Sequence, residues 1–118
     1  HAMKLYAFVI DWGGRVDLKS IAKPRTDYKS LLDVFEQALE SEMRVNANVN
    51  ELYERAFREK AYAAQLQFQW FVNEQVEEEK SIRDIVAKLR MVKDDPPSLL
   101  DMDRELGARV AAGKASRA

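Results

Sequence analysis

The sequence predicts an all-α fold, a bundle of long helices, and two observations carry this prediction. Charged residues make up 33% of the 118 residues, whereas glycine and proline contribute only four and three, a balance typical of helix-rich proteins. Two long segments, 30–57 and 61–90, also repeat apolar residues at steps of three and four, the period of an amphipathic helix. The length and the 47% hydrophobic content fit one globular domain.

Charge and cysteine content exclude several classes of protein. The 19 basic and 20 acidic residues give a net charge of −1, so we expect no nucleic-acid or membrane partner. No apolar run approaches the length of a membrane span. Cysteine is absent, which rules out disulfides and thiolate metal sites and suits the reducing cytoplasm, the location we expect.

The first element, residues 1–12, is predicted to be the end of a helix. Leu5, Phe8 and Trp12 follow His1 on one helical face. Gly13-Gly14 then supplies the left-handed conformation that ends a helix.

An extended crossover loop is predicted next, over residues 15–27. This segment has no periodic pattern and contains Pro24. We expect three apolar residues, Val16, Leu18 and Ile21, to hold it to a surface.

A long helix is predicted from Ser30 to about residue 57. Ser30-Leu-Leu-Asp33 is a variant of the capping box, with Asp in place of the usual Glu. Neither glycine nor proline marks the far end of this helix. Its stripe consists of Leu31, Phe35, Ala38, Leu39, Glu42, Val45, Val49, Leu52 and Ala56.

The next helix is predicted from about residue 61 to 90. Asp94-Asp-Pro-Pro97 breaks the chain, and Ser98 caps a short helix that Gly107 ends. We expect residues 1–107 to form the domain and residues 108–118 to form a flexible tail. The stripe of the second long helix consists of Ala64, Phe68, Phe71, Gln75, Glu78, Ile82, Ile85 and Leu89.

Three polar residues, Glu42, Gln75 and Glu78, interrupt these apolar stripes. A buried carboxylate costs several kcal/mol unless it is paired, protonated or bound to a metal. One interpretation is a hard-metal site of oxygen ligands, because carboxylates that converge from several helices, with a His, build di-iron centres. The other is a buried polar network, or a Glu held by an Arg. Both remain open at this point.

An acidic run, Glu74-Gln-Val-Glu-Glu-Glu79, surrounds two of these residues. Glu74 lies one turn from both Glu77 and Glu78, and like charges this close repel unless a cation or proton lies among them. The alternative is a solvated acidic face, which is the better interpretation for Glu79.

Two further residues have more than one interpretation. His1 is the only histidine, and it is either a remnant of cloning or a ligand that its helix directs inward. Trp70 is a core residue or an electron donor to an oxidising iron centre.

Three stretches of the chain carry a family resemblance. His1-Ala-Met-Lys-Leu-Tyr6, followed by Gly13-Gly-Arg-Val16, resembles the end of a second helix and the start of a long crossover. Leu66-Gln-Phe-Gln-Trp-Phe-Val-Asn-Glu-Gln-Val-Glu-Glu-Glu-Lys80 resembles a fourth helix, and Met102 to Gly107 a short fifth one. The sequence thus resembles a prokaryotic non-haem ferritin from residue 1 to about 107, which implies part of a ferritin-like four-helix bundle.

The resemblance implies specific roles at the iron centre. His1 corresponds to a ligand of the first iron and Glu42 to a bridging or second-iron ligand. Glu78 corresponds to a second-iron ligand, with Gln75 as a weak or hydrogen-bonding neighbour. Bacterioferritins and rubrerythrins instead carry a second E-x-x-H at this place. Two carboxylates, Glu74 and Glu77, correspond to ligands of an accessory third iron site.

The chain also departs from the family pattern. A ferritin subunit has a first helix with one iron-ligating Glu, and a second helix with a Glu three residues before the His, and neither is present. The apolar stripes would then lack partners. The missing part is expected on another polypeptide or on a longer subunit, rather than replaced by a second copy.

The implied function is iron storage. Fe(II) would be oxidised by O2 or peroxide at a di-iron ferroxidase centre, and ferric mineral would be deposited inside a homo-oligomeric shell of 24 subunits. No haem is predicted. The alternative from another class is a truncated, non-catalytic ferritin-like assembly or scaffold protein, and a third possibility is an unrelated helical binding module.

Overall fold

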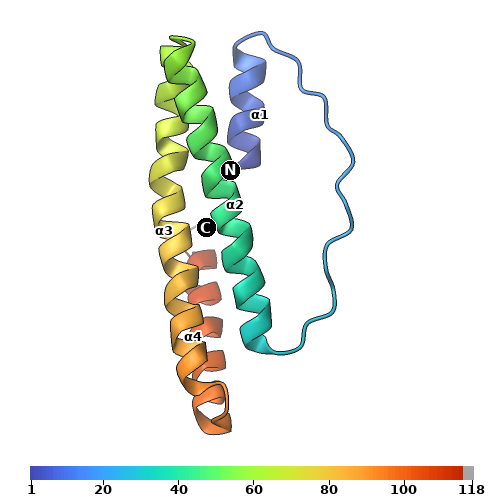
Figure 1. Cartoon of the computed structure of the whole chain (residues 1–118), viewed down its shortest axis with the longest axis vertical. Helices are drawn as coiled ribbons and strands as arrows, with labels where there is room; N and C mark the ends of the chain where they lie inside the picture. The colour runs from blue at the N-terminus through green and yellow to red at the C-terminus, as the bar shows by residue number, and fades with distance from the viewer. Residues whose placement is uncertain (116–118) are drawn as a thin grey trace.

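The computed structural model of the chain describes residues 1–115, and within them it contains four helices and no strand (Figure 1). Helix α1 spans Ala2–Asp11, α2 Leu31–Arg58, α3 Tyr62–Val92 and α4 Pro96–Ala115. Helices α2 and α3 are antiparallel neighbours. Helix α1 lies beside the half of this pair that is nearest the α2–α3 turn, and α4 packs on the other half of α3. The all-α prediction is confirmed.

Helix α1 ends where the glycine pair predicts. Gly13 has the left-handed φ of 73°, and its N–H donates to the Ile10 carbonyl at 2.9 Å. The Gly14 N–H donates to the Val9 carbonyl at 2.8 Å. A Cβ on Gly14 would lie 2.8 Å from Val9 Cγ1, so the close return of the chain also requires glycine there.

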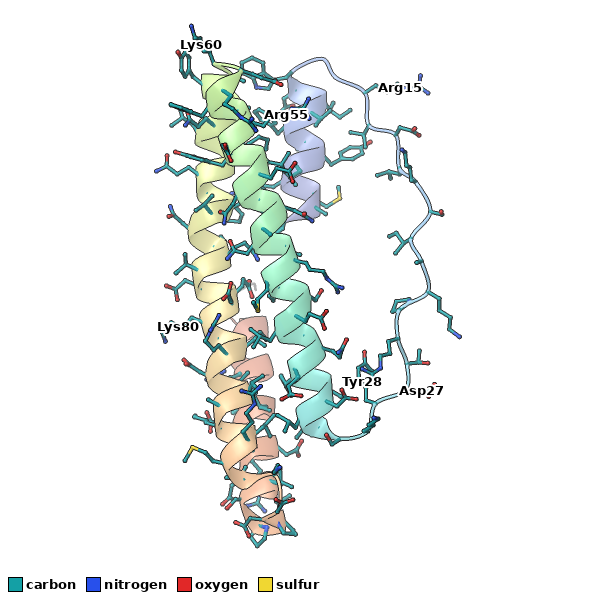
Figure 2. The ribbon with its side chains drawn as sticks, viewed as in Figure 1. Arg15, Asp27, Tyr28, Arg55, Lys60 and Lys80 are labelled. Atoms are coloured by element: carbon teal, nitrogen blue, oxygen red, sulfur yellow. The ribbon has the colours of Figure 1, made fainter. Side chains whose placement is uncertain are left out.

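The connection between α1 and α2 is irregular, as predicted, but it is less anchored than predicted. Val16 is half-buried, whereas the side chains of Leu18 and Ile21 are 81% and 92% exposed. The expectation that these two residues hold the loop to a surface is therefore wrong. The physical reason is visible in Figures 1 and 2: the loop swings away from the helices, and Asp27 and Tyr28 return it to the start of α2.

Ser30 and Asp33 together cap the start of α2. The Asp33 N–H donates to Ser30 Oγ at 3.0 Å, as a capping box requires. The Asp33 carboxylate, however, accepts from the Lys29 N–H at 3.0 Å rather than from Ser30. Arg25 also pairs with it at 2.7 Å. The Lys29 hydrogen bond, and then Arg25, lower the pKa of Asp33.

The turn between α2 and α3 uses a left-handed residue that is not glycine. Lys60 has a φ of 55°, and its N–H donates to the Phe57 carbonyl at 3.1 Å. The Ala61 N–H donates to the Ala56 carbonyl at 2.9 Å, which completes the helix end. Lys60 projects from the tip of the bundle in Figure 2. The boundary between α2 and α3, which neither glycine nor proline marks in the sequence, thus lies between the two apolar stripes.

The core lies between α2, α3 and α4. Leu89 is fully buried and Val86 is 2% exposed. A cluster at the α4 end joins the three helices, and its members are Ile85, Leu89, Met102, Leu32, Phe35, Val92, Leu99 and Leu106. By contrast, α1 contains no buried residue and reaches α3 through aromatic side chains, with Phe8 and Phe68 centroids 6.4 Å apart.

Helix α4 is longer than predicted. It begins at Pro96, where proline suits the first turn of a helix, and it continues through Gly107 to Ala115. Gly107 therefore does not end it. A helical glycine costs only about 1 kcal/mol, and Met102 and Leu106 hold the helix on the core cluster. Residues 116–118 of the predicted tail lie outside the described residues.

Among the described residues, no helix is long and apolar enough to cross a membrane.

Candidate metal centre

The start of α1 brings His1 to the middle of α3. Figure 1 shows the N-terminus at mid-height beside the long helices. The His1 imidazole meets two rings of α3 edge-on, Trp70 with a centroid distance of 5.4 Å and Phe71 with 5.8 Å. Aromatic packing therefore positions the only histidine of the chain against α3.

Three potential ligands gather at this point. One ligand atom each of His1, Glu74 and Glu78 lies within 4.8 Å of the other two. Glu74 and Glu78 are one helical turn apart on α3 and share a face with Trp70, one turn earlier. Glu74 is half-buried, whereas His1 and Glu78 are exposed. A neutral imidazole nitrogen with carboxylate oxygens is a ligand set that suits iron.

Glu42 and Gln75 form a second polar pair between α2 and α3. The Gln75 side chain is 1% exposed, and its amide nitrogen donates to Glu42 Oε2 at 3.1 Å. It also lies 3.4 Å from the Glu42 carbonyl oxygen. Among the described residues, no buried side-chain nitrogen or oxygen lacks a hydrogen-bond partner. This hydrogen-bonded pair fits the polar-network interpretation, and the iron-ligand roles of Glu42 and Gln75 stay predictions.

The predicted site residues therefore separate into two groups. His1, Glu74 and Glu78 converge, and Glu42 pairs with Gln75 on the adjoining turn. Glu77 is exposed and lies outside the cluster, because it is displaced around α3 from the face that Glu74 and Glu78 share. The separate roles predicted for Glu74 and Glu78 at different iron sites stay predictions.

Two contacts near the site were not expected from the sequence. Lys4 places its Nζ 3.3 Å from the centroid of the Trp70 ring. Glu79, expected on a solvated face, has a side chain only 18% exposed, which accepts from Asn46 at 2.9 Å and pairs with Arg83. These two donors lower the pKa of Glu79. The one sequence signal for Lys4 is its place one turn after His1.

Comparison with known proteins decides the family. The ferritin-like domain matches residues 1–92, most of the chain. The chain belongs to the ferritin-like family. The predicted resemblance and the predicted ferritin-like fold are both confirmed.

Two relatives of this ferritin-like chain come from bacteria. It is 36% identical over 107 residues to a probable bacterial non-heme ferritin-like protein of Haemophilus influenzae. The aligned region covers 91% of this chain and 65% of that protein. It is also 36% identical over 109 residues to a bacterial non-heme ferritin of Staphylococcus haemolyticus, covering 92% of this chain and 66% of the relative. The chain thus spans about two-thirds of the length of these relatives.

Among solved structures, an open-pore ferritin from the hyperthermophilic archaeon Archaeoglobus fulgidus is similar to this ferritin-like chain. The two superpose with a TM-score of 0.88 and share 45% sequence identity. The superposition covers 90% of this chain and 65% of the archaeal one. At this identity and coverage, the arrangement of α1 to α4 is that of the corresponding part of a ferritin.

Proposed function

We propose that the chain serves iron storage, by oxidising Fe(II) at a di-iron ferroxidase centre and passing ferric iron to a mineral inside a protein shell. The observation that carries this proposal is the convergence of His1, Glu74 and Glu78 beside the Glu42–Gln75 pair. Family membership supports it, since several relatives are named as ferritins.

In this proposal each side chain has a defined task. His1 holds the first iron, Glu42 bridges to or holds the second, and Glu78 holds the second. Gln75 is the hydrogen-bonding neighbour of Glu42. Fe(II) is the substrate, and two Fe(II) ions reduce O2 to peroxide and leave as Fe(III). The accessory ligands are Glu74 and Glu77.

The packing around the ligands suits a transient occupant. Gln75 holds Glu42 Oε2 through a single amide donor, which an incoming cation can replace. His1 and Glu78 are exposed, so iron reaches them from solvent and can leave again. Oxygen-rich ligation is typical of iron that is held only briefly.

Assembly is the second part of the proposal. Several large apolar side chains are exposed, among them Met3 at 71%, Leu66 at 70% and Met91 at 85%. Such a surface suits contact with further polypeptide. We propose a homo-oligomeric shell, of 24 subunits by family resemblance, located in the cytoplasm and independent of haem, nucleic acid or membrane.

Anaerobic Fe(II) titration followed by O2 tests the proposal. The wild-type chain is expected to give a rapid ferric absorbance rise, and Glu78→Gln and Glu42→Gln are each expected to slow it about 10- to 100-fold, the usual effect of disturbing a metal's ligand shell. Glu51→Gln, an exposed carboxylate on α2, is the matched control and should retain the wild-type rate. A wild-type rate no faster than buffer overturns ferroxidase activity.

One observation favours the alternative function, a non-catalytic scaffold protein. Helix α1, which carries His1, has no buried residue, so the ligand set depends on a lightly packed element. If the chain assembles by native mass yet gives no ferric burst, a non-catalytic assembly protein is the better interpretation. The third possibility, an unrelated binding module, conflicts with the family assignment.

A further inference from the structure

Lys4 covers the aromatic ring that borders the candidate metal centre. Its Nζ lies 3.3 Å from the Trp70 centroid, well within the range of a cation–π contact. The same indole meets the His1 imidazole edge-on, with centroids 5.4 Å apart and an interplanar angle of 84°. A positive charge therefore lies over the face of a ring that is in direct contact with a proposed ligand.

Trp70 is also connected to the centre along its own helix. It is half-buried, with Glu74 one turn further along α3 and Glu78 two turns further. Oxidation of two Fe(II) ions by O2 would release peroxide next to an indole, a side chain that readily loses one electron. Transfer of that electron would give H2O2 + e− → OH− + •OH and leave an indole radical cation.

We propose that Lys4 keeps Trp70 reduced during iron oxidation. The ammonium group is attracted to the neutral ring but repelled by a ring that has lost an electron. Both effects oppose oxidation of the indole, so the peroxide takes no electron from Trp70. Lys4 is thus a positioning residue that acts through Trp70. Its place in iron oxidation rests on the proposed function, whereas its effect on the ring does not require iron.

The iron-independent effect is tested in the metal-free full chain with an outer-sphere one-electron oxidant, the dianion hexachloroiridate(IV), which is reduced to iridium(III). The reaction is run at about 1 M salt, which screens the attraction of the dianion to Lys4. Site-resolved mass spectrometry measures the oxidation rate at each tryptophan. In Lys4→Met we expect Trp70 to be oxidised about tenfold faster than in wild type. Lys4→Arg, which keeps the charge, should match wild type. Trp12, which is 68% exposed and contacts Phe8, is the internal reference and should not change.

A structural explanation predicts a different result. If Lys4 only supported packing, Lys4→Met would leave the Trp70 rate within about twofold of wild type at equal helix content, and the inference would be overturned. Equal acceleration in Lys4→Arg and Lys4→Met would overturn it too, because charge would then be irrelevant.

A second measurement, with Fe(II) and O2, separates this inference from the proposed function. More Trp70 oxidation in Lys4→Met than in Lys4→Arg supports both. If ferric absorbance rises but Trp70 is oxidised in neither variant, the role of Lys4 during iron oxidation is overturned, while the iridium contrast still shows its effect on the ring. If no ferric absorbance rise occurs, the proposed function fails and only the iron-independent effect of Lys4 stands.

Discussion

Replacing Gln75 by glutamate would place a second carboxylate against Glu42 inside the bundle. The amide nitrogen of Gln75 is 3.1 Å from Glu42 Oε2, and the side chain is 1% exposed. Two carboxylates at that 3.1 Å separation repel by roughly 5 kcal/mol at an effective dielectric constant of about 20. Protonating one of them at pH 7 costs about 4 kcal/mol, because an ordinary Glu has a pKa near 4.3 and each pH unit is worth about 1.4 kcal/mol.

Protonation is the cheaper response and therefore limits the loss of stability. The introduced carboxyl then has a raised pKa in the folded state, so its penalty is absent at low pH and grows as pH rises. We expect Gln75→Glu to lower the free energy of unfolding by about 4 kcal/mol at pH 7 and by about 1 kcal/mol at pH 5.

Urea unfolding at both pH values checks this expectation. Gln75→Met removes the donor without adding a second carboxylate, and it should cost about 1.5–3 kcal/mol at pH 7. Gln69→Glu, at an exposed position of the same helix, should stay within about 0.5 kcal/mol of wild type. A Gln75→Glu variant that is equally destabilised at the two pH values, or not destabilised at all, would refute the reasoning.

Three further predictions concern the turn, the α2 cap and the core. Lys60→Gly should raise stability by about 0.5–1 kcal/mol in thermal unfolding, since relief at the positive φ exceeds the added entropy of the unfolded chain; a decrease would contradict this. Asp33→Asn should lower the melting temperature at pH 7 but not well below pH 4. The pKa of Asp33 is lower in the folded chain than the value of 3.8 in the unfolded chain, so ionised Asp33 stabilises the fold above pH 3.8. That stabilisation is lost as the pH falls through the folded-state pKa. An unchanged difference across that range would exclude this role of the Lys29 hydrogen bond. Leu89→Ala should cost about 2–5 kcal/mol in urea, whereas Met91→Ala, at an 85% exposed residue, should cost under about 0.5 kcal/mol; equal costs would place Leu89 outside the core.

The helices were predictable where local signals and the apolar period agree. Gly13-Gly14 ends α1, Ser30 begins α2, and α3 starts within two residues of the predicted position. The extent of α4 was not predictable, because Gly107 is a local stop signal that packing of Leu106 on the core overrides. Local propensity and tertiary contact conflict there, and the contact prevails.

The candidate site, too, was predictable from the sequence only in part. The interrupted stripes identified Glu42 and Gln75 as residues that need a partner, and they are partners of each other. The stripe alone placed Glu78 inside the bundle, yet it is exposed, since a helical period cannot tell where the neighbouring helices stop covering a face.

The sequence by itself determined the class of fold, the order of the helices and the family resemblance, because period, caps and motif spacing are properties of neighbouring residues. Only the tertiary structure decided which of the predicted ligands meet. His1 joins Glu74 and Glu78, more than seventy positions away, because α1 docks its aromatic face on α3. The same docking places Lys4 over Trp70. Contacts between segments so far apart depend on how helices pack, which no local pattern in the chain specifies.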